Sequence, residues 1–222
     1  MKNPEKAKII SGFFKTGKGE YGEGDLFIGM TVPESRKIAK KYADLSFNEI
    51  RKLLKSQFHE ERLVALLILV HNYQIGNEGQ KNDVFDFYIR NTYLINNWDL
   101  VDLTADKIIG ANLMDKEKNI LYNLARSRNL WERRISIIAT FHFIKKDNFY
   151  ETFRIAEMLL DDRHDLIHKA VGWMLREVGK KNQKAEEAFL KKNYKKMPRT
   201  MLRYAIERFP ENKKKFYLEK QN

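Results

Sequence analysis

Apolar residues recur every three or four positions along most of the chain, which is the period of an amphipathic α-helix. The strict alternation of apolar and polar residues that marks a β-strand is nearly absent. The pattern therefore predicts an all-α fold. The expected helices cover residues 4–15, 33–43, 46–56, 59–74, 80–91, 97–110, 116–126, 129–145, 149–160, 165–179, 184–193, 198–209 and 211–219.

Residues with known preferences for helix ends support these boundaries. Three of the four prolines stand at expected helix starts: Pro4, Pro33 and Pro198. Ser46 precedes a helix with Glu49 three residues further on, which is the pattern of a capping box. Asn129 and Asp165 are the expected N-caps of two later helices, because short polar side chains accept hydrogen bonds from unpaired helix N–H groups.

The helices occur in pairs, and the pairs recur. The segments HEERLVALLIL, NWDLVDLTADKI, NLWERRISIIAT, HDLIHKAVGWML and PRTMLRYAIER begin about 32 to 39 residues apart. Such a period is typical of solenoids of HEAT-like repeats, in which stacked antiparallel pairs share one core and second helices line a concave groove. We predict one superhelical domain over residues 1–222, with an irregular helical bundle as the alternative.

The charge balance points to a polyanionic partner. Lysine and arginine number 42 against 30 acidic residues, which gives a formal net charge of +12. Nucleic acid is the first candidate and an anionic membrane surface the second, while a lysine-rich solvated surface is the alternative to both.

Several classes of protein are disfavoured by what the sequence lacks. The absence of cysteine excludes disulfides, thiolate metal sites and a cysteine nucleophile, and it fits a reducing cytosol. The longest apolar run, residues 63–70, is too short to cross a bilayer, and the N-terminus lacks the apolar stretch of a signal peptide. We expect a soluble cytoplasmic monomer without a membrane partner.

Two motif-like strings do not predict a cofactor or a metal. GKGEYG, residues 17–22, matches a nucleotide-binding string, but a helix precedes it and acidic residues follow, so a tight loop with glycines at positive φ is the better interpretation. HEERL at His59 lacks the second histidine of a zinc protease motif. His164 and His168 lie four apart but have no evident third ligand. We therefore predict neither metal nor cofactor.

The three tryptophans each lie near ionisable groups on expected second helices. In NNWDLVD, Trp98 and Asp102 are four residues apart and so project from one helical face. The other two segments are LWERR, with Trp131, Arg133 and Arg134, and KAVGWMLRE, with Lys169, Trp173 and Arg176. A buried tryptophan beside a solvated acid is the alternative for any one of them, but three such segments favour a site.

A lysine- and arginine-rich stretch follows near the C-terminus. It contains Lys191, Lys192, Lys195, Lys196, Arg199, Arg203 and Arg208. Such a stretch is often only a solvated face, but here it extends the basic side of the last repeat and can contact phosphates. The candidate DNA-binding residues are Arg133, Lys169, Arg176, Arg199 and Arg203.

Together with LFIGMTVPESR, these segments resemble the AlkD-type DNA alkylation repair proteins in order and spacing over nearly the whole chain. The resemblance implies HEAT-like repeats around duplex DNA and hydrolysis of the N-glycosidic bond of cationic N3- or N7-alkylated purines. It further implies that Asp102 is catalytic, that Trp98 and Trp173 contact the deoxyribose of the lesion, and that Arg134 lies near its phosphates. Trp131 receives no role and is expected to be structural.

The resemblance leaves two other functions open. The family includes proteins that bind DNA, branched forms among them, with little or no base excision, so a catalytically inactive DNA-binding scaffold is the main alternative. A HEAT-type module that binds acidic proteins is a third possibility. Retention of Asp102 and of both tryptophans favours the enzyme.

Overall fold

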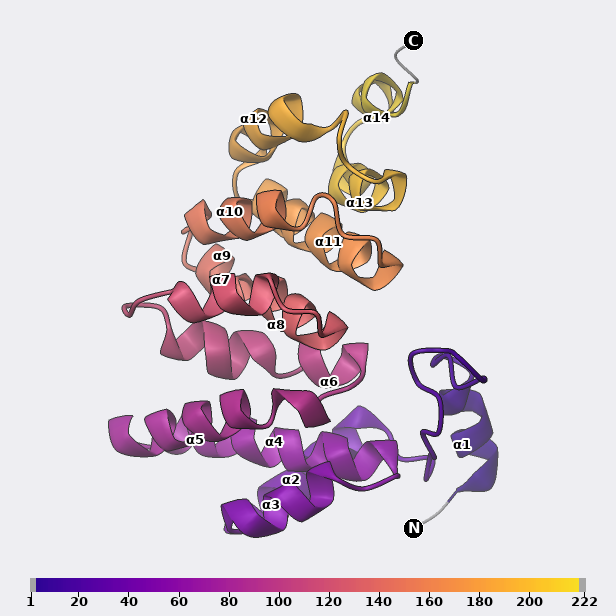
Figure 1. Cartoon of the computed structure of the whole chain (residues 1–222), viewed down its shortest axis with the longest axis vertical. Coiled ribbons are helices and arrows are strands. Elements are labelled where there is room, and N and C mark those ends of the chain that lie inside the picture. Colours follow the sequence, from indigo (N-terminus) through magenta and orange to yellow (C-terminus); the bar gives the residue numbers. More distant parts are fainter. Residues whose placement is uncertain (1–2, 220–222) are drawn as a thin grey trace. The chain divides into compact units, whose positions relative to one another are not determined.

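Helices account for most of residues 3–219, the part of the chain that the computed structural model describes (Figure 1). Within that part, the strand-like pairing is a single parallel bridge between Leu26 and Phe58. The chain divides into two compact units, one ending at Asn112 and the other beginning at Leu113. Helix pairs stack within each unit in the manner of a solenoid, which confirms the predicted fold class.

The first unit is built around α4 (His59–Ile75), a helix that is buried on nearly all sides. Its run LVALLILV supplies apolar side chains to neighbours in every direction, which explains why the apolar pattern there is continuous rather than one-sided. The other elements of the unit are α1 (Pro4–Ser11), α2 (Val32–Lys41), α3 (Phe47–Leu54), α5 (Glu78–Arg90), the 3-10 helix η1 (Thr92–Leu94), α6 (Trp98–Asp102) and the π-helical turn η2 (Asp106–Gly110). α4 packs against α2 and η2, and also against α3 and α5.

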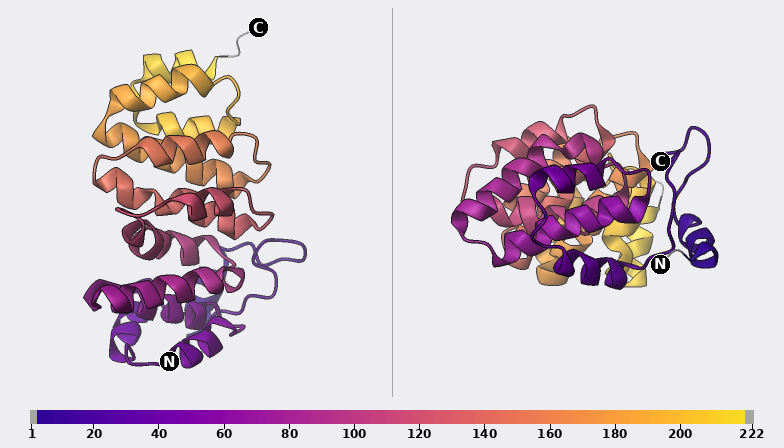
Figure 2. Two further views of the ribbon diagram at one scale, coloured as in Figure 1. Left: turned by 60° about the vertical axis from the view of Figure 1, so that its left-hand side comes forward. Right: turned by 90° about the horizontal axis from the view of Figure 1, so that it is seen from below.

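The segment between α1 and α2 lies beside this stack, as both views of Figure 2 show. Backbone hydrogen bonds tie Leu26 to α4: its N–H donates to Gln57 at 3.0 Å, and its carbonyl accepts from His59 at 2.8 Å. The buried carboxylate of Glu60 accepts three further backbone N–H groups of residues 28–30. The first turn of α4 is therefore the anchor of the loop.

Glycine is required where this loop turns. Gly29 has φ 90°, and a Cβ atom there would lie 2.2 Å from the carbonyl oxygen of Asn3. Gly19 and Gly24 have φ 78° and 83°. These values confirm the interpretation of the glycine-rich segment as a tight loop with positive φ angles.

The second unit is organised around α11 (Asp165–Lys181), which packs against α8, α12 and α13. The elements that surround it are α7 (Asn119–Ala125), α8 (Leu130–Ala139), α9 (Phe141–Lys145), α10 (Tyr150–Met158), α12 (Gln183–Asn193), α13 (Arg199–Ala205), the 3-10 helix η3 (Ile206–Arg208) and α14 (Glu211–Leu218). None of the helices among residues 3–219 is long and apolar enough to cross a membrane.

The predicted helix over residues 97–110 is not continuous. α6 ends at Asp102, a turn follows at Leu103, and the chain then winds as a wide π-helix. The hydroxyl of Thr104 donates to the carbonyl of Leu100 at 2.5 Å, and the amine of Lys107 donates to the carbonyl of Leu103 at 2.7 Å. In a regular helix these two carbonyls would accept backbone N–H groups, and here they accept side-chain groups instead. The regular helix is therefore interrupted directly after Asp102.

Two of the three predicted helix caps are confirmed. Ser46 and Glu49 form the capping box at the start of α3, and the side chain of Asn129 accepts the N–H of Trp131. The assignment of Asp165 was wrong. The cap of α11 is the preceding His164, whose Nδ1 accepts the N–H of Leu166 at 3.2 Å, while the carboxylate of Asp165 pairs with Lys169 at 2.6 Å.

Gly172 permits the close approach of α11 and α13. A Cβ atom at this position would lie 2.4 Å from the carbonyl oxygen of Met201 and 2.5 Å from the Cβ of Tyr204. We expect Gly172→Ala to lower the free energy of unfolding by about 1–3 kcal/mol, because the two helices must move apart. Urea denaturation measures this. Gly79→Ala on α5 is the matched control, since its Cβ would meet nothing closer than 3.5 Å; equal losses in the two variants would contradict the prediction.

Candidate active site

The five-residue helix α6 carries the candidate acid and one candidate ring. Trp98 begins the helix and Asp102 ends it, and both side chains are half-buried. Their spacing of four residues places them on the same face. The carboxylate of Asp102 lies within electrostatic reach of Tyr88: the pKa of that phenol is raised mainly by complete burial, and the charges of Asp106 and Asp102 add to the effect. The helix therefore carries Trp98 and Asp102 one turn apart.

A buried network of charged side chains fixes the start of α6. The imidazole of His59 lies between two carboxylates, with Nδ1 3.2 Å from Asp25 and Nε2 2.8 Å from Asp99. The guanidinium of Arg62 pairs with the other oxygen of Asp25 at 2.6 Å. The side-chain amide of Asn97, the N-cap of α6, donates to Asp25 at 3.2 Å. The loop, α4 and α6 therefore meet at one point.

The charges in this network balance when His59 is protonated. Burial alone lowers the pKa of His59, but the hydrogen bonds to Asp25 and Asp99 outweigh burial and raise it to about 9. Burial raises the pKa of Asp25, but its hydrogen bond to His59 and the charge of Arg62 hold it below its ordinary value. Two cations and two anions then compensate one another, which is the condition under which buried charges are tolerated.

Aromatic rings cover the network on the side of the loop. Phe14 stacks on Trp98, with ring centroids 5.3 Å apart and planes 18° from parallel. The same ring lies 4.7 Å from the imidazole of His59, and Phe27 lies 5.0 Å from that imidazole. The segment before α2 therefore limits the positions that the indole of Trp98 can adopt.

The second unit carries the remaining candidates for the site. Trp173, on α11, is half-buried and donates its indole N–H to Glu177 at 3.0 Å. Arg134, on α8, is buried and donates to the backbone carbonyl of Leu166. Trp131 is also buried, at 8% exposure, which agrees with the structural role expected of it.

The five candidate DNA-binding residues also lie in the second unit, and four of them have intramolecular partners. Arg133 pairs with Asp162 at 2.6 Å, Lys169 with Asp165 at 2.6 Å, Arg176 with Glu207, and Arg199 donates to the carbonyl of Leu218 at 2.7 Å. Arg203 is exposed on α13. An exposed pair such as that of Lys169 is weak, so its cation stays open to exchange with a phosphate.

Sequence reasoning did not find the buried network. In the sequence, His59 stood out only as the start of an incomplete zinc protease motif and Asp25 only as an acidic residue of the loop, because their separation of 34 residues follows no local period. The one feature of the sequence that hinted at the network is an acidic and a basic side chain at the start of an otherwise apolar helix, Glu60 and Arg62.

Within residues 3–219, no group of three or more histidine, aspartate or glutamate side chains is arranged to hold a metal ion.

Comparison with known proteins identifies relatives over nearly the whole chain. The model of a family described as DNA alkylation repair enzyme matches residues 1–209. A predicted DNA alkylation repair enzyme from Enterococcus faecalis has a similar structure, with a TM-score of 0.70 at 18% identity, over 95% of this chain and 98% of that one. The structure of smu.31 from Streptococcus mutans UA159 matches with a TM-score of 0.54 at 20% identity, over 78% and 89% of the two chains. Among curated proteins, none matches significantly.

Because of this network, the free energy of unfolding should decrease as the pH rises into the alkaline range. Since the pKa of His59 is raised from 6.5 to about 9 on folding, its contribution is complete below pH 6.5 and is lost as pH rises through about 9. We expect the melting temperature of the wild type to fall over this range, and the fall to be smaller in His59→Gln. His71→Gln is the control, since that histidine lies outside the network, and it is expected to keep the wild-type slope. An equal slope in His59→Gln would contradict the assignment.

Proposed function

The chain belongs to the DNA alkylation repair enzyme family, and from this premise we propose that it is a monofunctional glycosylase acting on cationic N3- and N7-alkylated purines in duplex DNA. The observation that supports this most directly is the placement of Trp98 and Asp102 one turn apart on α6, beside a buried network that holds the start of the helix. The net charge of +12 supports a polyanionic substrate.

The substrate is activated by its own charge. Alkylation at N3 or N7 makes the purine cationic, so the base departs readily with the electron pair of the broken N-glycosidic bond. Positive charge then moves from the base to C1′ and O4′ of the sugar. The task of the protein is to stabilise this oxocarbenium-like state more than it stabilises the intact nucleotide.

A carboxylate and an aromatic face can both do so. In the proposed mechanism, Asp102 stabilises the developing cation and accepts a proton from the water that attacks C1′, which leaves a neutral base and an abasic deoxyribose. The indole of Trp98 faces the cationic nucleotide, and contacts of this kind contribute about 0.5–2 kcal/mol. Stacking of Phe14 on Trp98 restricts the orientation of the indole before the nucleotide binds.

Further residues are assigned by the family resemblance alone. We propose that Trp173 supplies a second aromatic contact to the deoxyribose and that Arg134 acts on the phosphates next to the lesion. Arg133, Lys169, Arg176, Arg199 and Arg203 are proposed to contact other phosphates of the duplex, which would position the DNA without reading its sequence. These assignments predict that replacing any one of these residues impairs the protein in a way that can be distinguished from the effect of replacing Asp102.

The proposal is tested by replacing the carboxylate. Asp102→Asn keeps the shape of the side chain but loses its charge and basicity, so we expect release of 7-methylguanine from methylated duplex DNA to fall by about 100-fold or more. The measurement is the single-turnover rate with protein in excess over DNA. Asp86→Asn on α5 is the matched control because Asp86 is exposed, and it should retain the wild-type rate.

The main alternative gives a different result. A DNA-binding scaffold without base excision would bind the methylated duplex but release neither 7-methylguanine nor 3-methyladenine at any excess of protein. Equal rates for the wild type and Asp102→Asn would also reject the proposed role of the carboxylate. Absence of measurable DNA binding at low salt would leave only a protein-interaction module.

A further inference from the structure

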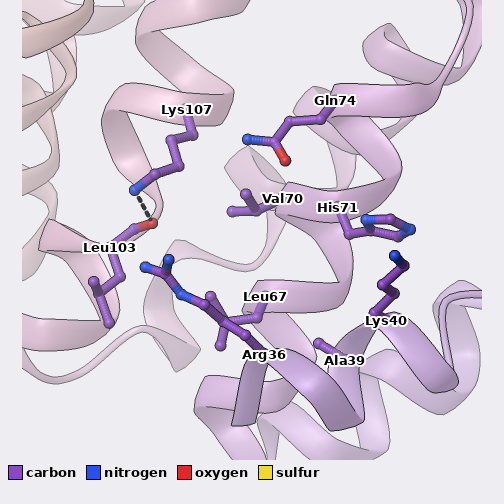
Figure 3. A pocket seen from close by; sticks show the side chains of 9 residues that line it. All are labelled: Arg36, Ala39, Lys40, Leu67, Val70, His71, Gln74, Leu103 and Lys107. Carbon is purple, nitrogen blue, oxygen red and sulfur yellow. Dashed lines mark hydrogen bonds between the residues drawn. The ribbon is translucent and has the colours of Figure 1, made fainter. Parts of the chain in front are cut away.

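A second feature of the first unit, separate from the candidate acid, is a basic cavity between α2, α4 and the turn that follows α6. Its volume is about 190 Å³. Figure 3 shows the side chains that line it: Arg36, Ala39, Lys40, Leu67, Val70, His71, Gln74, Leu103 and Lys107. No carboxylate is among them.

The cations of this cavity are not fully neutralised by the protein. Among residues 3–219, the side chains of Arg36 and Lys40 form neither a hydrogen bond nor an ion pair, and both are exposed. The amine of Lys107 donates to the carbonyl of Leu103 at 2.7 Å and lies 3.5 Å from the buried carboxylate of Asp106, which offsets part of its charge. The cavity therefore keeps a positive potential that a bound anion would balance.

The shape of the charge distribution favours one kind of anion. In Figure 3, the guanidinium of Arg36 and the amine of Lys107 lie at one side of the cavity, and the amine of Lys40 lies with His71 at the other side. Ala39, Leu67 and Val70 form an apolar wall between the two groups. A free phosphate needs only the cations, whereas a sugar–phosphate backbone offers an anionic oxygen to the cations and ribose carbons to an apolar wall.

We propose that this cavity binds a backbone phosphate of duplex DNA with its adjoining deoxyribose. The inference rests on the proposed function for its choice of DNA as the anion. It adds a contact in the first unit, where none of the five candidate DNA-binding residues lies. Leu103 lines the cavity and directly follows Asp102, so a strand held here passes beside α6. The cavity sets the register of the DNA relative to that helix.

The test is the salt dependence of binding to an undamaged duplex. Each phosphate contact that is lost makes the negative slope of log Kobs against log salt concentration shallower by about 1. We expect Arg36→Ala/Lys40→Ala to bind more weakly than the wild type and to reduce the magnitude of the slope by about 1 to 2. Both side chains are exposed, so an unchanged melting temperature is expected and shows that the variant is folded.

Two further variants separate a local contact from an effect of net charge. Lys52→Ala/Lys55→Ala removes the same two charges from exposed positions at the end of α3, outside the cavity, and should leave the slope nearly unchanged. Arg36→Lys/Lys40→Arg retains both charges and should restore the wild-type slope. A slope that falls equally in both alanine variants, or in neither, would overturn the proposal.

A free anion and a macromolecular anion are distinguished in the same experiment. Isothermal titration of inorganic phosphate into the wild type should give no saturable binding at millimolar concentration; tight binding that is lost in Arg36→Ala/Lys40→Ala would overturn the assignment to DNA. Because the duplex is undamaged, the result does not depend on base excision. A protein that fails to release methylated bases but shows the expected change in slope retains this site and loses only the glycosylase activity.

Discussion

The imidazole of His59 connects three segments that are distant in sequence, because each of its ring nitrogens has a carboxylate partner. Taking these charges out of water costs several kcal/mol per ion unless geometry and pairing are good. Asp25 from the loop, Asp99 from α6 and Arg62 from α4 meet that condition only when all three segments are in place. The position of α6 is therefore a consequence of charge compensation in the interior.

This constraint explains how a helix of only five residues can hold the candidate catalytic side chain of Asp102 in a fixed position. So short a helix has little intrinsic stability. Here the N-cap Asn97 is held by Asp25, Trp98 is stacked on Phe14, and the chain after Asp102 is closed by the side-chain bonds of the following turn. The sequence of the glycine-rich loop at first resembles a nucleotide-binding loop. In the structure, this loop instead supports the candidate site by holding α6 in place.

The sequence predicted the elements well and their contacts poorly. The positions of the helices, the capping box at Ser46 and the shared face of Trp98 and Asp102 follow from local periods, which act within a few residues. The break after α6 was missed because Thr104 competes for a backbone carbonyl, which apolar periodicity does not reveal. The partnership of His59 with Asp99 spans 40 residues and leaves no local pattern.

We propose that the charge-balanced network around His59 holds α6 in the position that the proposed base excision requires. The most direct measurement is the single-turnover rate of 7-methylguanine release by His59→Gln, compared with its affinity for undamaged duplex DNA. Since a displacement of about 1 Å can lower a rate by about 100-fold, the rate should fall by that order while the affinity is retained. An unchanged rate in a folded His59→Gln protein would contradict this role of the network.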